Sequence, residues 1–332
     1  MLLCMETITV DALDRRIIHA LYVDPRAPFS RLSEVLRSSE PTVSRRYRRL
    51  FDGRILRVVG QLDSQRLGQL DWAVRIRCAP GSAPTVATKI AELPDASWVQ
   101  LTSGGTEIFS TIRSRDGEQG TPFLLSQLSV GRQIVDYEAY CLLHLFATGL
   151  SAPPGPSDLN REEIAQLFAP PRDGPSLDHP KAKLQDSDWP LVQALADDGR
   201  SSYRQLAARI HWHESTVRRR VEELVASGVL YFDLDLASEV FGTRSQALLW
   251  MSVAPTNLRD VGTALASRPE FPFVAATTGS TNLLAALVCP DDLTLYEYLA
   301  DEMTGLDGLT RIETAPVTRF VKMHATMAQR QP

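Results

Sequence analysis

The chain has 332 residues, of which 44% are hydrophobic and 23% charged, and its formal net charge is -5. This composition is typical of a globular protein with two or more domains, and its overall acidity argues against nucleic-acid binding unless the charge is unevenly distributed. The four cysteines lie far apart and form no CxxC pair, which argues against a structural metal site. No run of ~18 apolar residues indicates a membrane span, and the opening residues lack the regions of a signal peptide. We therefore expect a cytoplasmic protein with no membrane partner.

The first predicted unit is helical. Its opening segment, DALDRRIIHALY, places Leu13, Ile17 and Leu21 on one face of an amphipathic helix. A second short helix, an arginine-rich helix and the alternating segment RILRVVGQL follow in chain order. Three helices and a strand hairpin are the elements of a winged helix-turn-helix, which we expect over residues 8–62.

The arginine-rich helix lies in SSEPTVSRRYRRL, and Val43, Tyr47 and Leu50 share one of its faces. Most arginines point away from that face. Residues 11–60 hold eleven arginines and six acidic residues, a net charge of +5 in an acidic protein. An arginine guanidinium can form two hydrogen bonds to guanine or to a phosphate. This pattern therefore favours a DNA-contacting helix over a solvated face. The residues expected to contact DNA are Thr42, Ser44, Arg45, Arg46, Arg48 and Arg49.

The next segment changes to short strands separated by two helices. Strands are expected at WAVRIRC, SWVQL, EIFSTI and IVDYEAY, with helices near 84–93 and 121–128. The order βαββαβ predicts a ferredoxin-like domain over residues 68–148. A Pro- and Gly-rich linker follows at 149–181, with a short helix at 160–168 in an otherwise plain tether.

The second half of the chain repeats the first. An offset of 174 residues aligns 13–56 with 187–230 without a gap, and an offset of 175 aligns the strand-rich segments. A second winged helix-turn-helix is therefore expected at 182–236 and a second βαββαβ domain at 242–326. The predicted fold class is α+β, with both domain types in tandem. Identical pairs include Asp14/Asp188, Arg26/Arg200, Arg46/Arg220, Gly104/Gly279 and Glu138/Glu313.

The second arginine-rich helix differs from the first in charge. Glu222 and Glu223 stand where the first copy has the outward Arg48 and Arg49. Residues 184–233 hold six arginines and eight acidic residues, a net charge of -2. We expect this module either to contact DNA more weakly or to be kept for packing. Its candidate DNA contacts are Thr216, Arg218, Arg219 and Arg220.

The segments TVSRRYRRL…RILRVVGQLDSQRLG (42–68) and TVRRRVEELVASGVLYFDLDLASEVFG (216–242) resemble the Lrp/AsnC family of leucine-responsive regulators. The resemblance covers both halves of the chain. It implies a transcription regulator that binds double-stranded DNA, and a βαββαβ domain that dimerises and senses small molecules, often amino acids. Typical members carry one such unit, so this chain resembles a tandem fusion that acts as a pseudo-dimer. A homo-oligomer is expected.

The resemblance also implies an effector site near the turn between the second and third strands, at contacts between dimers. The family's glycine, which a tight turn needs for its positive φ, matches one glycine in each copy. The acidic-aromatic pair that follows it in the family is replaced by Gly-Thr and Ser-Thr. The hydroxyls of these turns therefore either bind a ligand or, as we favour, only stabilise the turn. The candidate effector residues are Thr102, Ser103, Gly104, Gly105, Thr106, Thr277, Thr278, Gly279, Ser280 and Thr281.

The alternative function is that of a sirohaem decarboxylase, an enzyme of tetrapyrrole biosynthesis that resembles paired regulator-like subunits. Such an enzyme is expected to lack a basic recognition helix and to place histidine or arginine in a sheet-domain cavity. The strand-rich segments offer only His144 and His324, without a nearby acid–base partner. His211 and His213 lack a third ligand and favour a solvated turn over a metal site. We expect a DNA-binding regulator rather than an enzyme, with no cofactor, metal or catalytic residue and with a dominant N-terminal module.

Overall fold

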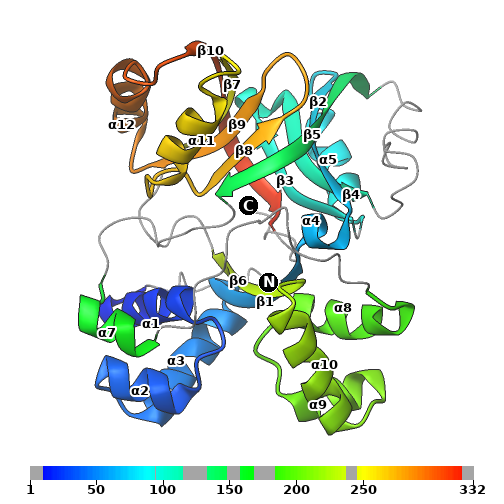
Figure 1. Cartoon of the computed structure of the whole chain (residues 1–332), viewed down its shortest axis with the longest axis vertical. Coiled ribbons are helices and arrows are strands. Elements are labelled where there is room, and N and C mark those ends of the chain that lie inside the picture. Colours follow the sequence, from blue (N-terminus) through cyan, green and yellow to red (C-terminus); the bar gives the residue numbers. More distant parts are fainter. Residues whose placement is uncertain are drawn as a thin grey trace, which may run out of the picture.

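The computed structural model describes residues 10–93, 95–114, 133–147, 158–167, 184–236 and 245–323. The molecule has two layers (Figure 1). One layer contains the helices of both helix-turn-helix modules, and the other is a barrel built from the sheet strands of both copies. Each layer thus combines one contribution from each half of the sequence.

The first helical module has three helices, of which the first and third begin at a side-chain cap. Asp11 and Asp14 form a capping box at the first helix, and Ser39 caps the third helix by accepting a hydrogen bond from the Thr42 N–H. The buried positions of these helices recur at helical spacing, as the apolar pattern predicted. The helices are α1 (Ala12–Val23), α2 (Phe29–Leu36) and α3 (Glu40–Asp52).

The second helical module repeats this arrangement with different caps. Ser202 and Gln205 form a capping box at its second helix, which ends at His211 in a left-handed conformation with φ of 58°. His213 is the N-cap residue of the following helix. Both histidines therefore lie in the turn between two helices. The elements are η2 (Asp186–Asp188), α8 (Trp189–Asp197), α9 (Tyr203–Ile210) and α10 (Glu214–Ala226).

Each module continues into a single strand, and the two strands pair with each other. The strands β1 (Leu56–Leu62) and β6 (Leu230–Leu236) form an antiparallel two-stranded sheet. The expectation of a wing hairpin within each module is therefore wrong. The backbone groups at the open edge of each strand form their hydrogen bonds with the strand of the other copy instead. Gly60 permits the close approach of α8, since a Cβ there would lie 2.9 Å from the Cβ of Leu195. A single apolar core joins both modules to this strand pair.

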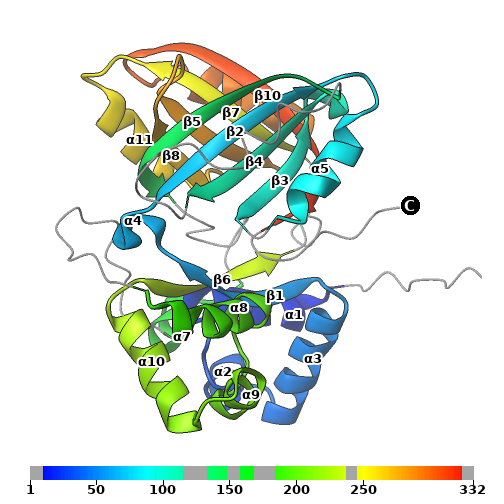
Figure 2. The ribbon, with the colours of Figure 1, turned by 90° about the vertical axis from the view of Figure 1, so that its right-hand side faces the viewer.

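The sheet strands of both copies form one closed eight-stranded barrel (Figure 2). Its strand order is β10-β3-β4-β2-β5-β8-β9-β7, so β5 of the first copy pairs with β8 of the second, and β10 pairs with β3. The expected helix near 121–128 lies outside the described residues. The elements are α4 (Ser64–Leu67), β2 (Leu70–Cys78), α5 (Ala83–Ala91), β3 (Ala96–Thr102), η1 (Ser103–Gly105), β4 (Glu107–Ser114), β5 (Ile134–Ala147), β7 (Ser245–Val253), α11 (Leu258–Ala266), β8 (Phe273–Thr277), β9 (Leu283–Cys289), α12 (Asp292–Glu297), the π-helical turn η4 (Tyr298–Glu302) and β10 (Leu309–Lys322).

Alternation along the strands divides the barrel side chains between two environments. One set packs beneath the outer helices α5 and α11 in two separate cores. The other set fills the barrel interior, where Phe109, Tyr140 and Trp250 meet and the Tyr140 and Trp250 ring centroids are 4.8 Å apart. Across the described ranges, no helix has both the length and the apolar character needed to cross a membrane.

The helix expected within the linker forms as α7 (Arg161–Leu167) and packs on the first helical module. Leu159 and Leu167 are buried in the core of the helical layer. Arg16 Nη2 on α1 lies 2.7 Å from Glu163 Oε1 on α7. The expectation of a plain tether is therefore wrong for residues 158–167, because two leucines there bury apolar surface against the module.

Candidate DNA-contacting helix and barrel-end cluster

The outward face of α3 is the most basic exposed surface of the first module. A shallow hollow runs along it, lined by Pro41, Ser44, Arg45, Arg48, Arg49, Asp52 and Gly53. Arg45 and Arg48 are exposed, and within the described residues neither takes part in an ion pair. Thr42 lies at the helix start with its hydroxyl 2.8 Å from Ser39 Oγ, and Ser44 is half-buried. Arg45 and Arg48 are thus the free cations of this helix.

Two arginines that the sequence pattern placed on DNA have partners on α1. Arg46 Nη1 donates to both Asp11 and Asp14, and Arg49 Nη2 donates to Asp14. The Asp14 side chain is fully buried, whereas the Arg49 side chain is 43% exposed. Asp14 lies 32 and 35 positions before these arginines, so the i±4 pattern of the helix does not reveal it.

Arg220 in the second module forms the ion pair that corresponds to the first module's Arg46–Asp14 pair. Its Nε and Nη2 donate to the Asp188 carboxylate at 2.9 and 2.6 Å. Burial raises the pKa of Asp188, but hydrogen bonds from Arg220 outweigh this effect and hold that pKa below its usual value. The repeated Asp and Arg positions therefore fasten the third helix of each module to its first.

The remaining arginines of α10 also have partners within the module. Arg219 Nη1 lies 2.7 Å from Glu223 Oε1, and Arg220 Nη1 lies 3.1 Å from the other oxygen of the same carboxylate. Arg218 lies 3.8 Å from Glu214 and places its guanidinium 5.1 Å from the Tyr203 ring centroid. The half-buried Thr216 lies in the first turn of the helix. The α10 face is therefore neutralised by its own acidic residues, whereas α3 retains two unpaired arginines.

The two helices lie on opposite flanks of the helical layer, with α2 and α9 between them (Figure 2). The β1–β6 pair and the common core connect the two modules. One chain thus presents two third helices in a fixed relationship.

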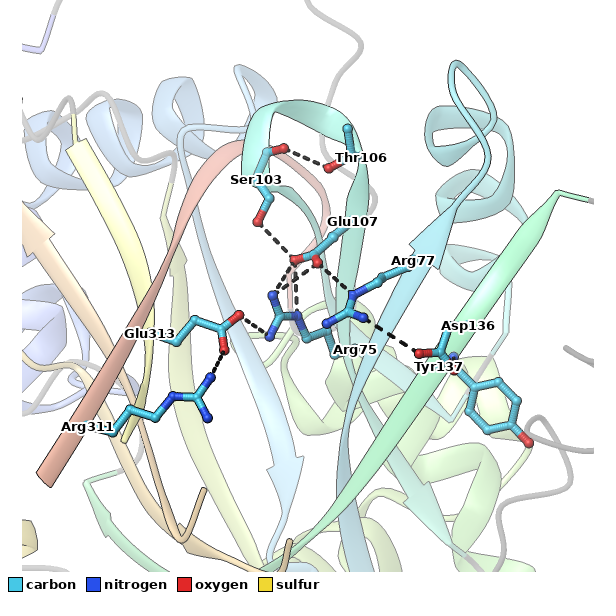
Figure 3. Close-up of polar contacts among 9 residues, drawn as sticks. All are labelled: Arg75, Arg77, Ser103, Thr106, Glu107, Asp136, Tyr137, Arg311 and Glu313. Atoms are coloured by element: carbon cyan, nitrogen blue, oxygen red, sulfur yellow. Dashed lines mark hydrogen bonds and ion pairs between the residues drawn. The ribbon is translucent and has the colours of Figure 1, made fainter. Parts of the chain in front are cut away.

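A polar cluster occupies one end of the barrel, next to the first candidate effector turn (Figure 3). Arg75 binds Glu107 through Nε and Nη2, each at 3.0 Å, and its Nη1 lies 2.6 Å from Glu313 Oε1 of the second copy. Hydrogen bonds from Arg75 lower the pKa of Glu107, although burial opposes this shift. We name this set the barrel-end cluster; its members are Arg75, Arg77, Ser103, Glu107, Asp136, Arg311 and Glu313.

Like Arg311, Arg77 and Asp136 are exposed members of the barrel-end cluster. Their side chains are 50% and 56% exposed, and Arg77 Nη1 lies 3.7 Å from Asp136 Oδ2. Arg77 also donates to Glu107 at 3.2 Å. The sequence pattern did not identify Arg77 or Asp136 as site residues. The only indication was that both lie on strands with one end beside the turn.

The first candidate effector turn is satisfied internally but open to solvent. Ser103 Oγ donates to Glu107 Oε2 at 2.9 Å, and Thr106 Oγ1 donates to the Ser103 carbonyl at 2.8 Å. Thr102 is buried. Gly104 and Gly105 have φ of 70° and 81°, and a Cβ at either would meet nothing within 4 Å. The structure therefore gives these hydroxyls a role in the turn and leaves its glycines uncovered.

The second candidate turn is exposed at Thr278, Gly279 and Ser280, but a side chain of the first copy lies against its glycine. A Cβ at Gly279, where φ is 105°, would lie 2.5 Å from Cδ1 of Tyr140. The Thr278 hydroxyl accepts from the Cys141 N–H, and Thr277 Oγ1 donates to the Thr281 carbonyl. The corresponding residue that would cover the first turn is Ala315, 175 positions after Tyr140, and its side chain is too short to cover it.

Ser280 and Thr281 complete this second turn. The Ser280 carbonyl accepts a hydrogen bond from Ser252 Oγ at 3.2 Å. Thr281 Oγ1 is buried and has no hydrogen-bond partner among the described residues. The two turns, similar in sequence, are both exposed at their tips and differ in the Tyr140 ring that lies against the glycine of the second turn.

Comparisons with known proteins agree with this domain arrangement. The model of the AsnC-type helix-turn-helix domain matches residues 10–50 and 184–225, and that of the Lrp/AsnC ligand binding domain matches residues 246–327. The chain belongs to the Lrp/AsnC family of transcription regulators, with the family unit present in tandem.

Individual relatives correspond to about one copy of the repeat. An uncharacterised HTH-type transcriptional regulator of Pyrococcus abyssi is 29% identical over 143 residues, which is 43% of this chain and 90% of that protein. The regulator LrpA1 of Halobacterium salinarum is 24% identical over 121 residues, or 36% of this chain and 85% of that protein.

A solved structure resembles the whole chain. The siroheme decarboxylase NirDL superposes with a TM-score of 0.63 at 14% identity, covering 94% of this chain and 93% of that chain. At this level of identity the likeness shows a shared tandem fold.

Proposed function

We propose that this chain is a DNA-binding transcription regulator in which the two copies act together as a pseudo-dimer, with α3 as the principal DNA-contacting helix. The observation that carries the proposal is the pair Arg45 and Arg48, exposed and without ion pairs within the described residues, in a segment of net charge +5. Such cations bind phosphates or guanine edges in the major groove. The arginines of α10 are already paired with acidic residues, which favours an unequal contribution.

The test begins with recovery of genomic DNA fragments on the purified protein, followed by gel-shift titrations over a series of salt concentrations. Arg45→Ala combined with Arg48→Ala is expected to weaken binding and to reduce the log–log salt slope by about 0.9 for each phosphate that the variant no longer binds. The matched control, Lys89→Ala with Arg161→Ala, removes two exposed charges from α5 and α7 and should leave both quantities unchanged.

Unchanged affinity after the α3 substitutions would refute the assignment of that helix. An equal decrease after Arg218→Ala with Arg219→Ala would refute the asymmetry between α3 and α10. Recovery of no DNA, together with a visible tetrapyrrole absorption band in the purified protein, would instead favour a sirohaem-decarboxylase-like enzyme.

We also propose that the first turn, and not the second, binds a small-molecule effector such as an amino acid. Arg77 and Asp136 offer opposite, half-exposed charges beside that turn, which match the carboxylate and ammonium groups of an amino acid. Both glycines are exposed, but the Tyr140 ring occupies the space next to Gly279 where a Cβ would lie, and the same space next to Gly104 is empty to 4 Å.

A further inference from the structure

Arg26 and Arg200 are at equivalent positions of the repeat, and each extends its side chain to the other helical module. Arg26 and Arg200 follow the same local turn, in which the arginine N–H donates to an aspartate two residues earlier. Each guanidinium then leaves its own module. Arg26 donates to the Ser201 carbonyl at 3.3 Å, and Arg200 donates to the carbonyls of Pro25 and Ala27, each at 2.8 Å.

The aromatic contacts of the two arginines are also reciprocal. The Arg26 guanidinium lies 5.2 Å from the Tyr203 ring centroid, and the Arg200 guanidinium lies 4.6 Å from the centroid of Phe29, which is the equivalent residue of the first copy. Each arginine thus rests on the first residue of the other module's second helix.

The contacts made by Arg200 and Arg26 are not equivalent, and the difference concerns α3. The Arg200 guanidinium also lies 5.2 Å from the ring of Tyr47, a buried residue on the inward face of α3. Arg200 therefore touches both helices of the first helix-turn-helix and hydrogen-bonds the backbone just before α2. Arg26 also has a second ring, since its guanidinium lies 4.8 Å from the Phe232 ring centroid, but Phe232 is on β6 and not on a helix. Arg26 makes one carbonyl bond, and its Nη1 is buried without a partner among the described residues.

We propose that Arg200 is a positioning residue for α3, so that the second helical module serves as a scaffold for the DNA-contacting helix of the first. This inference rests on the proposed function. Its physical basis is that a guanidinium fixed by two carbonyls and stacked on two rings limits the movement of the elements that supply them. The second module then contributes to DNA binding although the arginines of its α10 are paired with acidic residues.

The experiment compares Arg200→Met, Arg26→Met and the control Arg204→Met, which replaces an exposed arginine of α9. Arg200→Met should lower DNA affinity about tenfold, the effect expected from removing charged hydrogen bonds and stacking on the rings. The salt slope should stay unchanged, because Arg200 does not bind phosphate. The other two variants should bind within about twofold of the parent protein.

Arg200→Lys provides a second variant that keeps the charge over the rings but not the forked pair of hydrogen bonds. It should show a smaller decrease of affinity in the same direction, at an unchanged salt slope. A decrease of affinity with a slope reduced by about 0.9 would mean that Arg200 itself binds phosphate, and would overturn the proposal. Equal decreases for Arg26→Met and Arg200→Met would overturn it as well.

Hydrogen exchange without DNA separates this proposal from the proposed function. Arg200→Met should accelerate amide exchange across residues 29–52, whereas Arg26→Met should do so across 203–210. Unchanged exchange in residues 29–52 would refute the scaffold role. If the parent protein binds no DNA and exchange still increases as stated, the DNA-binding proposal fails and the positioning of α3 by Arg200 stands.

Discussion

Replacing Asp188 by asparagine tests whether the buried Arg–Asp pair holds α10 in place. Asp188 is 1% exposed and accepts hydrogen bonds from Arg220 at 2.9 and 2.6 Å and from the Gln185 N–H at 2.8 Å. Removing one partner of a buried pair costs roughly 3–5 kcal/mol. Because Arg220 is 20% exposed and retains Glu223 at 3.1 Å, we expect a smaller cost of about 2 kcal/mol in the free energy of unfolding.

Urea unfolding followed by the helical circular dichroism signal measures this cost. The matched control is Asp197→Asn, since Asp197 also pairs with an arginine, Arg209, but their side chains are 42% and 51% exposed. An exposed pair of this kind contributes about 0.5 kcal/mol or less. If Asp188→Asn costs no more than Asp197→Asn, the buried pair does not fasten α10 to its module.

The cost of the same substitution should depend on pH in a defined direction. The hydrogen bonds from Arg220 hold the pKa of folded Asp188 below its usual 3.8, despite the opposing effect of burial. A carboxyl group with a lowered folded pKa stabilises the protein fully above its unfolded pKa, and this stabilisation is lost as the pH falls through the folded value. The difference between the parent protein and Asp188→Asn should therefore be largest near neutral pH and shrink below about pH 4. A difference in the free energy of unfolding that is equally large at neutral pH and at acidic pH would contradict an origin in the carboxylate charge.

The barrel turns provide two further predictions. Both Gly104→Ala and Gly279→Ala place alanine at positive φ, which costs about 1–2 kcal/mol, but only at 279 would the new Cβ lie 2.5 Å from Tyr140. We expect this contact to cost about 1–3 kcal/mol more, so equal thermal shifts for the two variants would exclude a close contact with Tyr140. In calorimetric titrations, an amino-acid effector is expected to bind with one site per chain; two sites, or none for all amino acids tested, would contradict the proposed site at the first turn.

Within the residues that the structure describes, the periodicity of the sequence was sufficient to predict the helices of both helix-turn-helix modules and the order of the strands along the chain. Val43, Tyr47 and Leu50 are buried as the helical wheel of α3 requires. The partners of the α3 arginines could not be found from that wheel, because Asp14 is distant in the sequence and approaches only when α1 packs on α3. The repeat did contain a signal, since both Asp14 and Arg46 have identical counterparts in the second copy.

The contacts between copies were not predictable from the repeat alone. The sequence offset identifies equivalent residues of the two copies. It does not show whether a strand pairs within its own copy or with the other copy, so the β1–β6 pair and the closed barrel could not be deduced from it. The same limit applies to Tyr140, whose ring covers Gly279 of the other copy. We expected a wing hairpin because we assumed that the strand of each module pairs with a second strand of the same module. In the structure it pairs with the strand of the other module.

The differences between copies explain what a fused chain permits that two identical subunits do not. In a symmetric homodimer each substitution appears twice, so a residue that blocks one turn also blocks the other. Here Tyr140 and Ala315 occupy equivalent positions, and only the glycine of the second turn has an aromatic ring against it. The helical layer shows the same division, since Arg48 has Glu222 as its counterpart. The two proposed binding surfaces, the exposed arginines of α3 and the turn whose glycine has no side chain against it, both belong to the first copy. Substitutions in the second copy should therefore act mainly through stability and positioning, and those on the two first-copy surfaces mainly through direct binding of DNA or effector.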